Sequence, residues 1–237
     1  MKKVSQHPQS SRIKRVAGGL LLAMGLFLGV IMAISHYLPL PPESKSAANP
    51  MQEYVVQQLP LYADFPWTTA LHVIPSILLM ALLGLQLIPA LRRRFPTWHR
   101  YSGRVLVVAA VIITVSGLYI GIRFPFGGMA ESVATVVISA LFLVFIAKGV
   151  GAIRRKDVQA HRRWMLRMTA TALTPISMRL MFFPIVALTD IAPRVAFAPL
   201  LLVGLTVNLV LLQLWLRRAN TAAVTKIHEQ QPMAQAA

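Results

Sequence analysis

The chain of 237 residues is 56% hydrophobic and only 13% charged, yet its formal net charge is +17. Because a soluble domain has about 25% charged residues, this composition excludes an ordinary water-soluble fold and favours a membrane protein. The absence of cysteine excludes disulfides, thiolate nucleophiles and iron–sulfur clusters.

Apolar segments of about 20 residues, the length that a helical membrane span requires, follow one another along the chain. There are six, and they cover approximately 16–38, 67–91, 105–122, 133–153, 165–188 and 197–216. The first is too long for the apolar core of a signal peptide, which has ~7–15 residues, so we expect it to be retained as a helix. Long apolar blocks also exclude a membrane β-barrel, whose strands are short and alternate in polarity. The sequence therefore predicts an all-α, polytopic membrane bundle of six transmembrane helices.

The distribution of charge predicts that the N-terminus and the C-terminus both lie in the cytoplasm. In that orientation, the inner segments hold all of the 24 Lys and Arg residues except Lys45, Arg123, Lys148, Arg179 and Arg194. Loops rich in Lys and Arg stay on the cytoplasmic side of a membrane. We therefore expect a multi-pass protein of the bacterial inner membrane, oriented N-in and C-in.

This topology predicts three regions: a basic cytoplasmic N-terminus over 1–15, a six-helix membrane domain over 16–218 and a polar C-terminal tail over 219–237. The inner cations are dispersed among short loops beside the bilayer, where anionic lipid head groups are their natural partners. We expect no binding of nucleic acid. The chain also lacks a Gly-rich phosphate loop and a zinc-binding His–Glu signature, so we do not expect a stand-alone enzyme.

Ionisable side chains inside a membrane span are functional candidates, because their burial in lipid is costly. His72 lies in the outer part of the second apolar segment, and Arg179 is expected at a similar depth in the fifth. His99 and His161 each open a basic run at the inner surface, and His36 lies near the outer end of the first segment. The sequence thus predicts an outer and an inner layer of histidine.

Several short motifs follow one another between Leu71 and Met181. They are His72 on a segment that ends in Gly84-Leu85-Gln86, then Pro96-Thr97-Trp98-His99-Arg100 with Gly103-Arg104, Ser116-Gly117-Leu118-Tyr119, His161-Arg162-Arg163-Trp164-Met165 with Arg167, and Met178-Arg179-Leu180. In this order they resemble a family of uncharacterised bacterial membrane proteins, the domain of unknown function 2306. The resemblance covers residues 71–181 and implies a multi-pass membrane protein, without implying a reaction.

The two layers of histidine suggest a protein that binds haem b and transfers electrons, because haem iron takes axial histidine ligands. His72, His99 and His161 are the candidate ligands of the haem iron, and Arg179 would support cofactor binding at the outer site. Inner cations such as Arg167 would pair with the haem propionates. Such a protein would exchange electrons with a redox partner or a quinone.

Two other functional classes remain open. A small-molecule or proton-coupled transporter would use His72 and Arg179 as a buried polar site, although the spans lack the carboxylates on which proton relays usually depend. A structural or assembly partner without a cofactor would use the same side chains for contacts between helices.

Overall fold

The computed structural model describes residues 64–234, and all regular secondary structure in that range is α-helical. Five helical stretches there are long and apolar enough to cross a membrane: Pro66–Leu87, Pro96–Arg123, Gly128–Arg154, Val158–Leu188 and Pro193–Ala219. They coincide with the apolar segments predicted after the first, which confirms an all-α, polytopic membrane protein. The predicted first span, 16–38, and the basic N-terminus, 1–15, lie outside the described residues.

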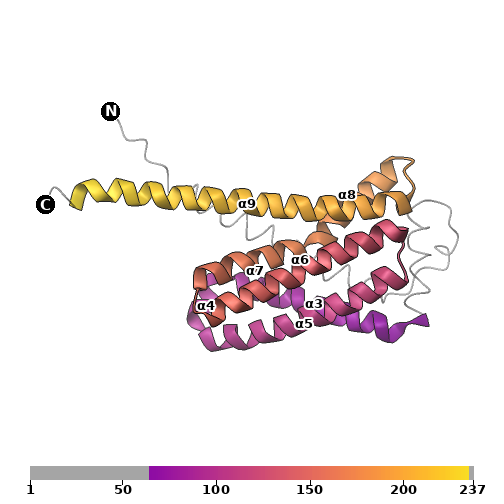
Figure 1. Ribbon diagram of the computed structural model, residues 1–237, viewed down its shortest axis with the longest axis horizontal. Helices are drawn as coiled ribbons and strands as arrows, with labels where there is room; N and C mark the ends of the chain where they lie inside the picture. Colours follow the sequence, from indigo (N-terminus) through magenta and orange to yellow (C-terminus); the bar gives the residue numbers. More distant parts are fainter. Residues whose placement is uncertain (1–63, 235–237) are drawn as a thin grey trace. The chain divides into compact units, whose positions relative to one another are not determined.

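The chain divides into two compact units, and the boundary between Thr135 and Val136 falls inside one long helix. The first unit contains α3 (Pro66–Leu87), α4 (Pro89–Arg94), α5 (Pro96–Arg123) and the first turns of α6 (Gly128–Arg154). The second unit contains the rest of α6, α7 (Val158–Ala172), α8 (Thr174–Leu188) and α9 (Pro193–Ala234), which Figure 1 labels in chain order.

Proline residues set the ends of the helices in the first unit. Ile88 precedes Pro89 and has an extended backbone (φ −78°, ψ 110°), because a residue before proline avoids the helical conformation. Phe95 (φ −130°, ψ 69°) precedes Pro96 and separates the short basic helix α4 from α5 in the same way. The predicted second span, 67–91, therefore ends earlier than expected, with the end of α3.

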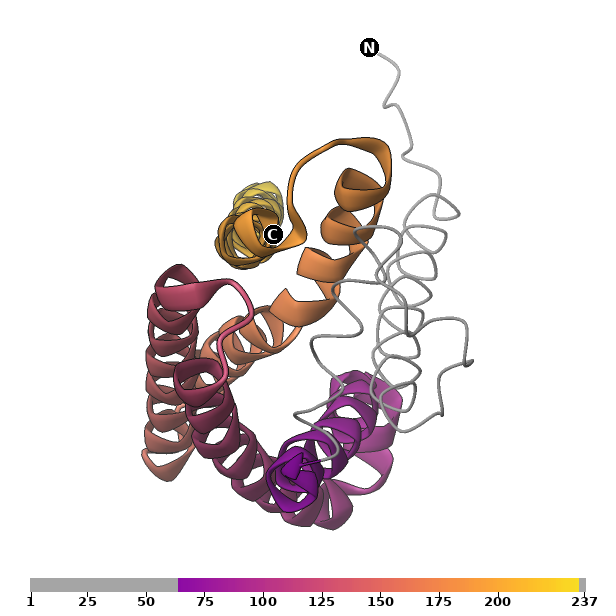
Figure 2. The same cartoon turned by 90° about the vertical axis from the view of Figure 1, so that its right-hand side faces the viewer.

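Helices α3 and α5 lie side by side and form the core of the first unit (Figure 1 and Figure 2). Leu79 and Leu83 of α3 and Leu106 of α5 are buried, as are the small residues Ala109 and Ala110. Small residues let helices in lipid approach closely, because helix association there depends on van der Waals packing. This close pairing positions the polar side chains that α3 and α5 share.

The span Val158–Leu188 of the second unit is interrupted at Leu173, which separates α7 from α8. Pro175 lies in the first turn of α8 and lacks the N–H that an uninterrupted helix would use there. The predicted fifth span, 165–188, thus consists of two helices and begins earlier than expected. Helix α9 packs against both. A Cβ atom at Gly204 of α9 would lie 3.1 Å from the backbone nitrogen of Met178, so glycine permits this close approach.

Helix α9 continues past the predicted end of the sixth span at residue 216, and it ends at Ala234. It therefore extends through most of the segment predicted as a polar tail, 219–237. That segment contains six Ala and three Gln residues, which favour helix without requiring an apolar partner. The part of α9 that is apolar enough to cross a membrane ends at Ala219.

Candidate functional site

His72 lies between α3 and α5 in the first unit. Its ring is half-buried, and Nδ1 lies 3.2 Å from Oγ of Ser116 on α5. Gly117, the next residue, leaves room for the ring, because a Cβ atom there would lie 3.0 Å from Cε1 of His72. The Ser116-Gly117 pair therefore forms the binding position of the imidazole: Ser116 hydrogen-bonds the ring and Gly117 leaves space for it.

The hydrogen bonds of Ser116 decide which nitrogen of His72 carries the proton. Its Oγ lies 2.8 Å from the carbonyl oxygen of Ile112 and 3.4 Å from that of Leu71. Carbonyl oxygens only accept, so the single hydroxyl proton goes to one of them and Oγ accepts from Nδ1–H of His72. In the neutral ring, the second nitrogen, Nε2, is then the one without a proton.

The carbonyl of Leu71 is exposed to this hydroxyl for a reason that lies in the sequence. In a regular helix it would accept a hydrogen bond from the residue four positions later, but that residue is Pro75, which has no N–H. A freed carbonyl in a membrane helix must find another donor, and a neighbouring hydroxyl is a common one. Because Pro75 leaves the Leu71 carbonyl without a donor, Ser116 is favoured at the position from which it also binds His72.

His161 lies in the first turn of α7, in the second unit. Asp157 caps this helix by accepting a hydrogen bond of 2.8 Å from the backbone nitrogen of Ala160, which fixes where α7 begins. Nδ1 of His161 lies 2.8 Å from the carbonyl oxygen of Gly149 on α6. Because that oxygen can only accept, Nδ1 carries the proton and the lone pair of the neutral ring is on Nε2.

Gly149 permits this arrangement because it has no side chain. A Cβ atom there would lie 2.8 Å from Sδ of Met165, so any larger residue would have to displace α7 or its methionine. The polypeptide reverses direction between α6 and α7 at Lys156, which adopts a left-handed conformation (φ 61°). The close contact and the tight turn together hold the His161 ring against the α6 backbone.

Cations and aromatic rings surround the start of α7. Nζ of Lys148 lies 4.7 Å and Cζ of Arg167 lies 4.8 Å from the ring centroid of Trp164. Phe145 stacks against the same indole with a centroid separation of 5.9 Å. Trp164 is one turn after His161, so the imidazole has positive charge within reach on the same unit.

His99 belongs to a separate polar group at the start of α5. Nε2 of Gln86 donates to the backbone carbonyl of His99 at 3.0 Å and to Oγ of Ser102 at 2.8 Å. Seventeen residues of α5 separate His99 from Ser116, the partner of His72, which corresponds to ~25 Å along the helix axis. Within the first unit, the partner of His72 and the position of His99 are therefore far apart along α5.

Arg179 is half-buried on α8, and its Nη1 donates to the carbonyl oxygen of Pro175 on the same helix at 3.2 Å. The interruption at Leu173 separates it from His161 on α7. Within the second unit, the described hydrogen bonds of His161 and Arg179 therefore go to different partners, Gly149 and Pro175.

Sequence reasoning singled out the histidines but missed the atoms that hold them. Gly149 gave no distinctive signal, because glycine is common in apolar helices. Ser116 and Gly117 form one of the recognised motifs. However, the hydrogen bond from one and the space left by the other depend on the pairing of α3 with α5, which brings His72 to them.

Comparison with known proteins yields a family and nothing closer. A family model described as a predicted membrane protein (DUF2306) matches residues 69–216, which is more than half of the chain and includes all four predicted site residues. No curated protein matches the chain significantly, and no solved structure does.

Proposed function

The chain belongs to the DUF2306 family of predicted membrane proteins, and we propose that this multi-pass membrane protein binds haem b through its histidines and transfers electrons in the bacterial inner membrane. The observation that carries the proposal is the hydrogen bond of 2.8 Å from Nδ1 of His161 to the carbonyl oxygen of Gly149. Metal-binding histidines almost always donate their second N–H in this way, which fixes the ring and makes the ligating nitrogen more basic.

His72 has the same chemical form with a different acceptor. Its Nδ1 donates to the hydroxyl of Ser116, and the close contact with Gly117 restricts the orientation of the ring. His161 thus offers Nε2 as the ligating atom, with its tautomer fixed by the Gly149 carbonyl, and His72 is proposed as a second ligand on another helix, with its Nδ1 bound to Ser116.

The number of available ligands favours haem over a metal ion held by side chains alone. Within residues 64–234, no group of three or more His, Cys, Asp or Glu side chains could hold a metal ion. A zinc site usually takes three or four protein ligands. Haem supplies its own equatorial nitrogens, so one or two histidines are sufficient.

The remaining polar residues would serve the same cofactor chemistry. When bound, haem supplies a one-electron change of iron oxidation state. Lys148 and Arg167, which both lie against Trp164 one turn after His161, would pair with its propionates by charge-assisted hydrogen bonds. His99 is a further candidate ligand of the inner layer, and Arg179 would support a cofactor at the outer one. With N-in and C-in orientation, the two layers would carry electrons between the two faces of the membrane, from a redox partner or a quinone.

Optical spectroscopy tests the proposal directly. The full chain would be purified in detergent from cells supplied with a haem precursor, and spectra would be recorded oxidised and after reduction with dithionite. We expect a reduced b-type band that His161→Ala abolishes or strongly weakens, with a smaller or separate loss in His72→Ala. His228→Ala is the matched control, since His228 lies beyond the family-matched residues.

Circular dichroism of each variant would show whether helical content is preserved, so that loss of cofactor is not confused with misfolding. A protein without haem in a pyridine extract would refute the proposal and favour a transporter or a structural partner. Haem that is bound normally by both the His161→Ala and the His72→Ala variants would refute the assignment of these ligands.

A further inference from the structure

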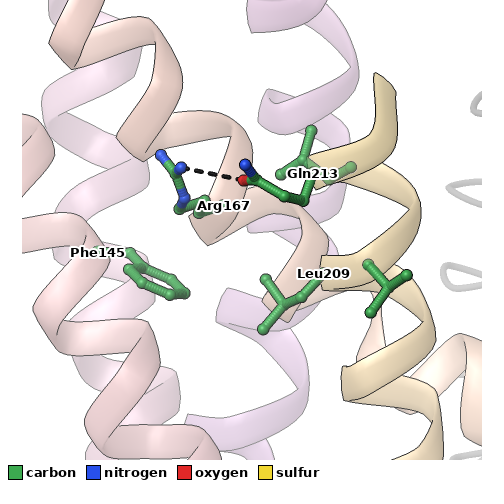
Figure 3. Close-up of a pocket in the computed structure, with 6 residues that line it drawn as sticks. Phe145, Arg167, Leu209 and Gln213 are labelled. Atoms are coloured by element: carbon green, nitrogen blue, oxygen red, sulfur yellow. Dashed lines mark hydrogen bonds between the residues drawn. The ribbon is translucent and has the colours of Figure 1, made fainter. Parts of the chain in front are cut away.

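An open cavity of about 270 Å³ lies in the second unit, between α6, α7 and α9. Its lining is mostly apolar, with Phe145 from α6 and Leu209, Val210 and Leu212 from α9. Figure 3 shows Arg167 and Gln213 facing one another at one end, while Phe145 and Leu209 form the apolar end. The cavity is therefore amphipathic, with a cationic end and a hydrocarbon end.

The positive charge of Arg167 is not neutralised by its two described hydrogen-bond acceptors. Arg167 donates from Nη2 to Oε1 of Gln213 at 3.3 Å and from Nη1 to the carbonyl oxygen of Arg163 at 3.4 Å. Both acceptors are neutral oxygen atoms, so they orient the guanidinium without compensating its positive charge. A guanidinium held in this way presents a fork of N–H groups that suits a phosphate or a carboxylate.

More cation–aromatic pairs belong to the helices that line the cavity. Cζ of Arg162 lies 6.0 Å from the ring centroid of Trp215 on α9, and Nζ of Lys148 lies 4.7 Å from that of Trp164. Trp is enriched where the hydrocarbon core of a bilayer meets the head groups. The aromatic rings thus mark the level of the head groups, and the cations supply the charge that an anionic head group would meet.

The distribution of charge along α7 and α8 agrees with a position of Arg167 at the level of the head groups. Arg162, Arg163 and Arg167 follow one another in α7, whereas residues 168–188 contain a single charged side chain, Arg179. Basic residues gather at the cytoplasmic end of a membrane span. We therefore place Arg167 at the edge of the hydrocarbon, with Leu209, one turn of α9 before Gln213, on the acyl-chain side of it.

We propose that this cavity binds one anionic phospholipid, with the phosphate against Arg167 and an acyl chain along Leu209 and Leu212. Charge complementarity at one end and an apolar lining at the other match this occupant, and basic pockets between membrane helices are known binding places for acidic head groups. The site contains no proposed iron ligand but shares Arg167 with the proposed function, in which Arg167 would pair with a haem propionate. Retention of a lipid is therefore measured separately from haem content, so that either proposal can fail without the other.

Native mass spectrometry of the full chain tests this site. The protein would be released from nanodiscs made of equal parts phosphatidylglycerol and phosphatidylcholine. We expect one phosphatidylglycerol to be retained in preference to phosphatidylcholine. Arg167→Gln should lower that preference about fivefold, the effect of one cation near an anionic surface. Arg154→Gln is the matched control: it removes the same charge from an exposed residue that does not line the cavity.

A second variant tests the apolar end and does not alter charge. Leu209→Trp would fill the cavity and should also lower retention of phosphatidylglycerol, with helicity by circular dichroism unchanged. Equal retention of the two lipids by the wild type, or equal behaviour of Arg167→Gln and Arg154→Gln, would overturn the proposal. Displacement of the retained species by a short-chain quinone but not by added phosphatidylglycerol would assign the cavity to a quinone instead, and would overturn it as well.

Discussion

Asn208 of α9 joins the two halves of the interrupted span, and its replacement by leucine should destabilise the second unit. Its Oδ1 accepts from Oγ of Ser177 on α8 at 2.8 Å, and its Nδ2 donates to the carbonyl oxygen of Ala170 on α7 at 3.1 Å. Ala170 lies within the last turn of α7, where carbonyls have no partner inside the helix. The amide thus satisfies the backbone that the interruption leaves exposed in an apolar environment.

The expected cost follows from these two hydrogen bonds. An interhelical side-chain hydrogen bond in a membrane protein contributes about 0.6 kcal/mol on average and about 1.7 kcal/mol at most. Asn208→Leu preserves the approximate volume of the side chain and removes both bonds. The free energy of unfolding should therefore fall by about 1–3 kcal/mol, with the larger value if the Ala170 carbonyl finds no other donor.

Unfolding in mixed micelles with increasing fractions of dodecyl sulfate, followed by circular dichroism, would measure this difference. Thr206→Val is the matched control on the same helix: Thr206 is exposed and donates only to the carbonyl of Leu202, one turn earlier at 2.8 Å. The double variant with Ser177→Ala separates the two bonds. We expect the two changes to be less than additive by about 0.5 kcal/mol or more, because they remove the same interaction.

A result in which Asn208→Leu costs no more than Thr206→Val would refute this reasoning. It would mean that the ends of α7 and α8 satisfy their backbone groups without α9.

Two further predictions concern packing and orientation. Gly121→Ala should destabilise the first unit by about 1–3 kcal/mol, since its new Cβ would lie 2.7 Å from Oγ1 and 2.8 Å from Cγ2 of Thr135. In the same unfolding titration, adding Thr135→Ala should restore part of the lost stability. If no stability is recovered, another contact is responsible for the loss. Because the chain contains no cysteine, single introduced cysteines can report its topology. In intact cells, a membrane-impermeant maleimide should label Met129→Cys but not Arg155→Cys. The reverse labelling pattern would show that the N-in, C-in orientation is wrong.

The sequence by itself determined the class of the protein and the approximate position of its described spans. Membrane insertion depends on the length and apolarity of a continuous segment, which can be read without knowing its neighbours. Helix ends at Ile88 and Phe95 were also encoded locally, because proline restricts the residue before it. The interruption near Pro175 has the same kind of local cause, although its position at Leu173 required the structure.

Only the tertiary structure decided which atoms hold the histidines. Ser116 is 44 residues from His72, and Gly149 is 12 residues from His161 on another helix. In lipid, an apolar helix face is equally compatible with acyl chains and with a neighbouring helix, so the pattern of apolar residues does not show which face packs inward. The choice is made by close contacts at glycine and by freed carbonyls that need donors. These depend on the register between helices, which no single segment of the sequence contains.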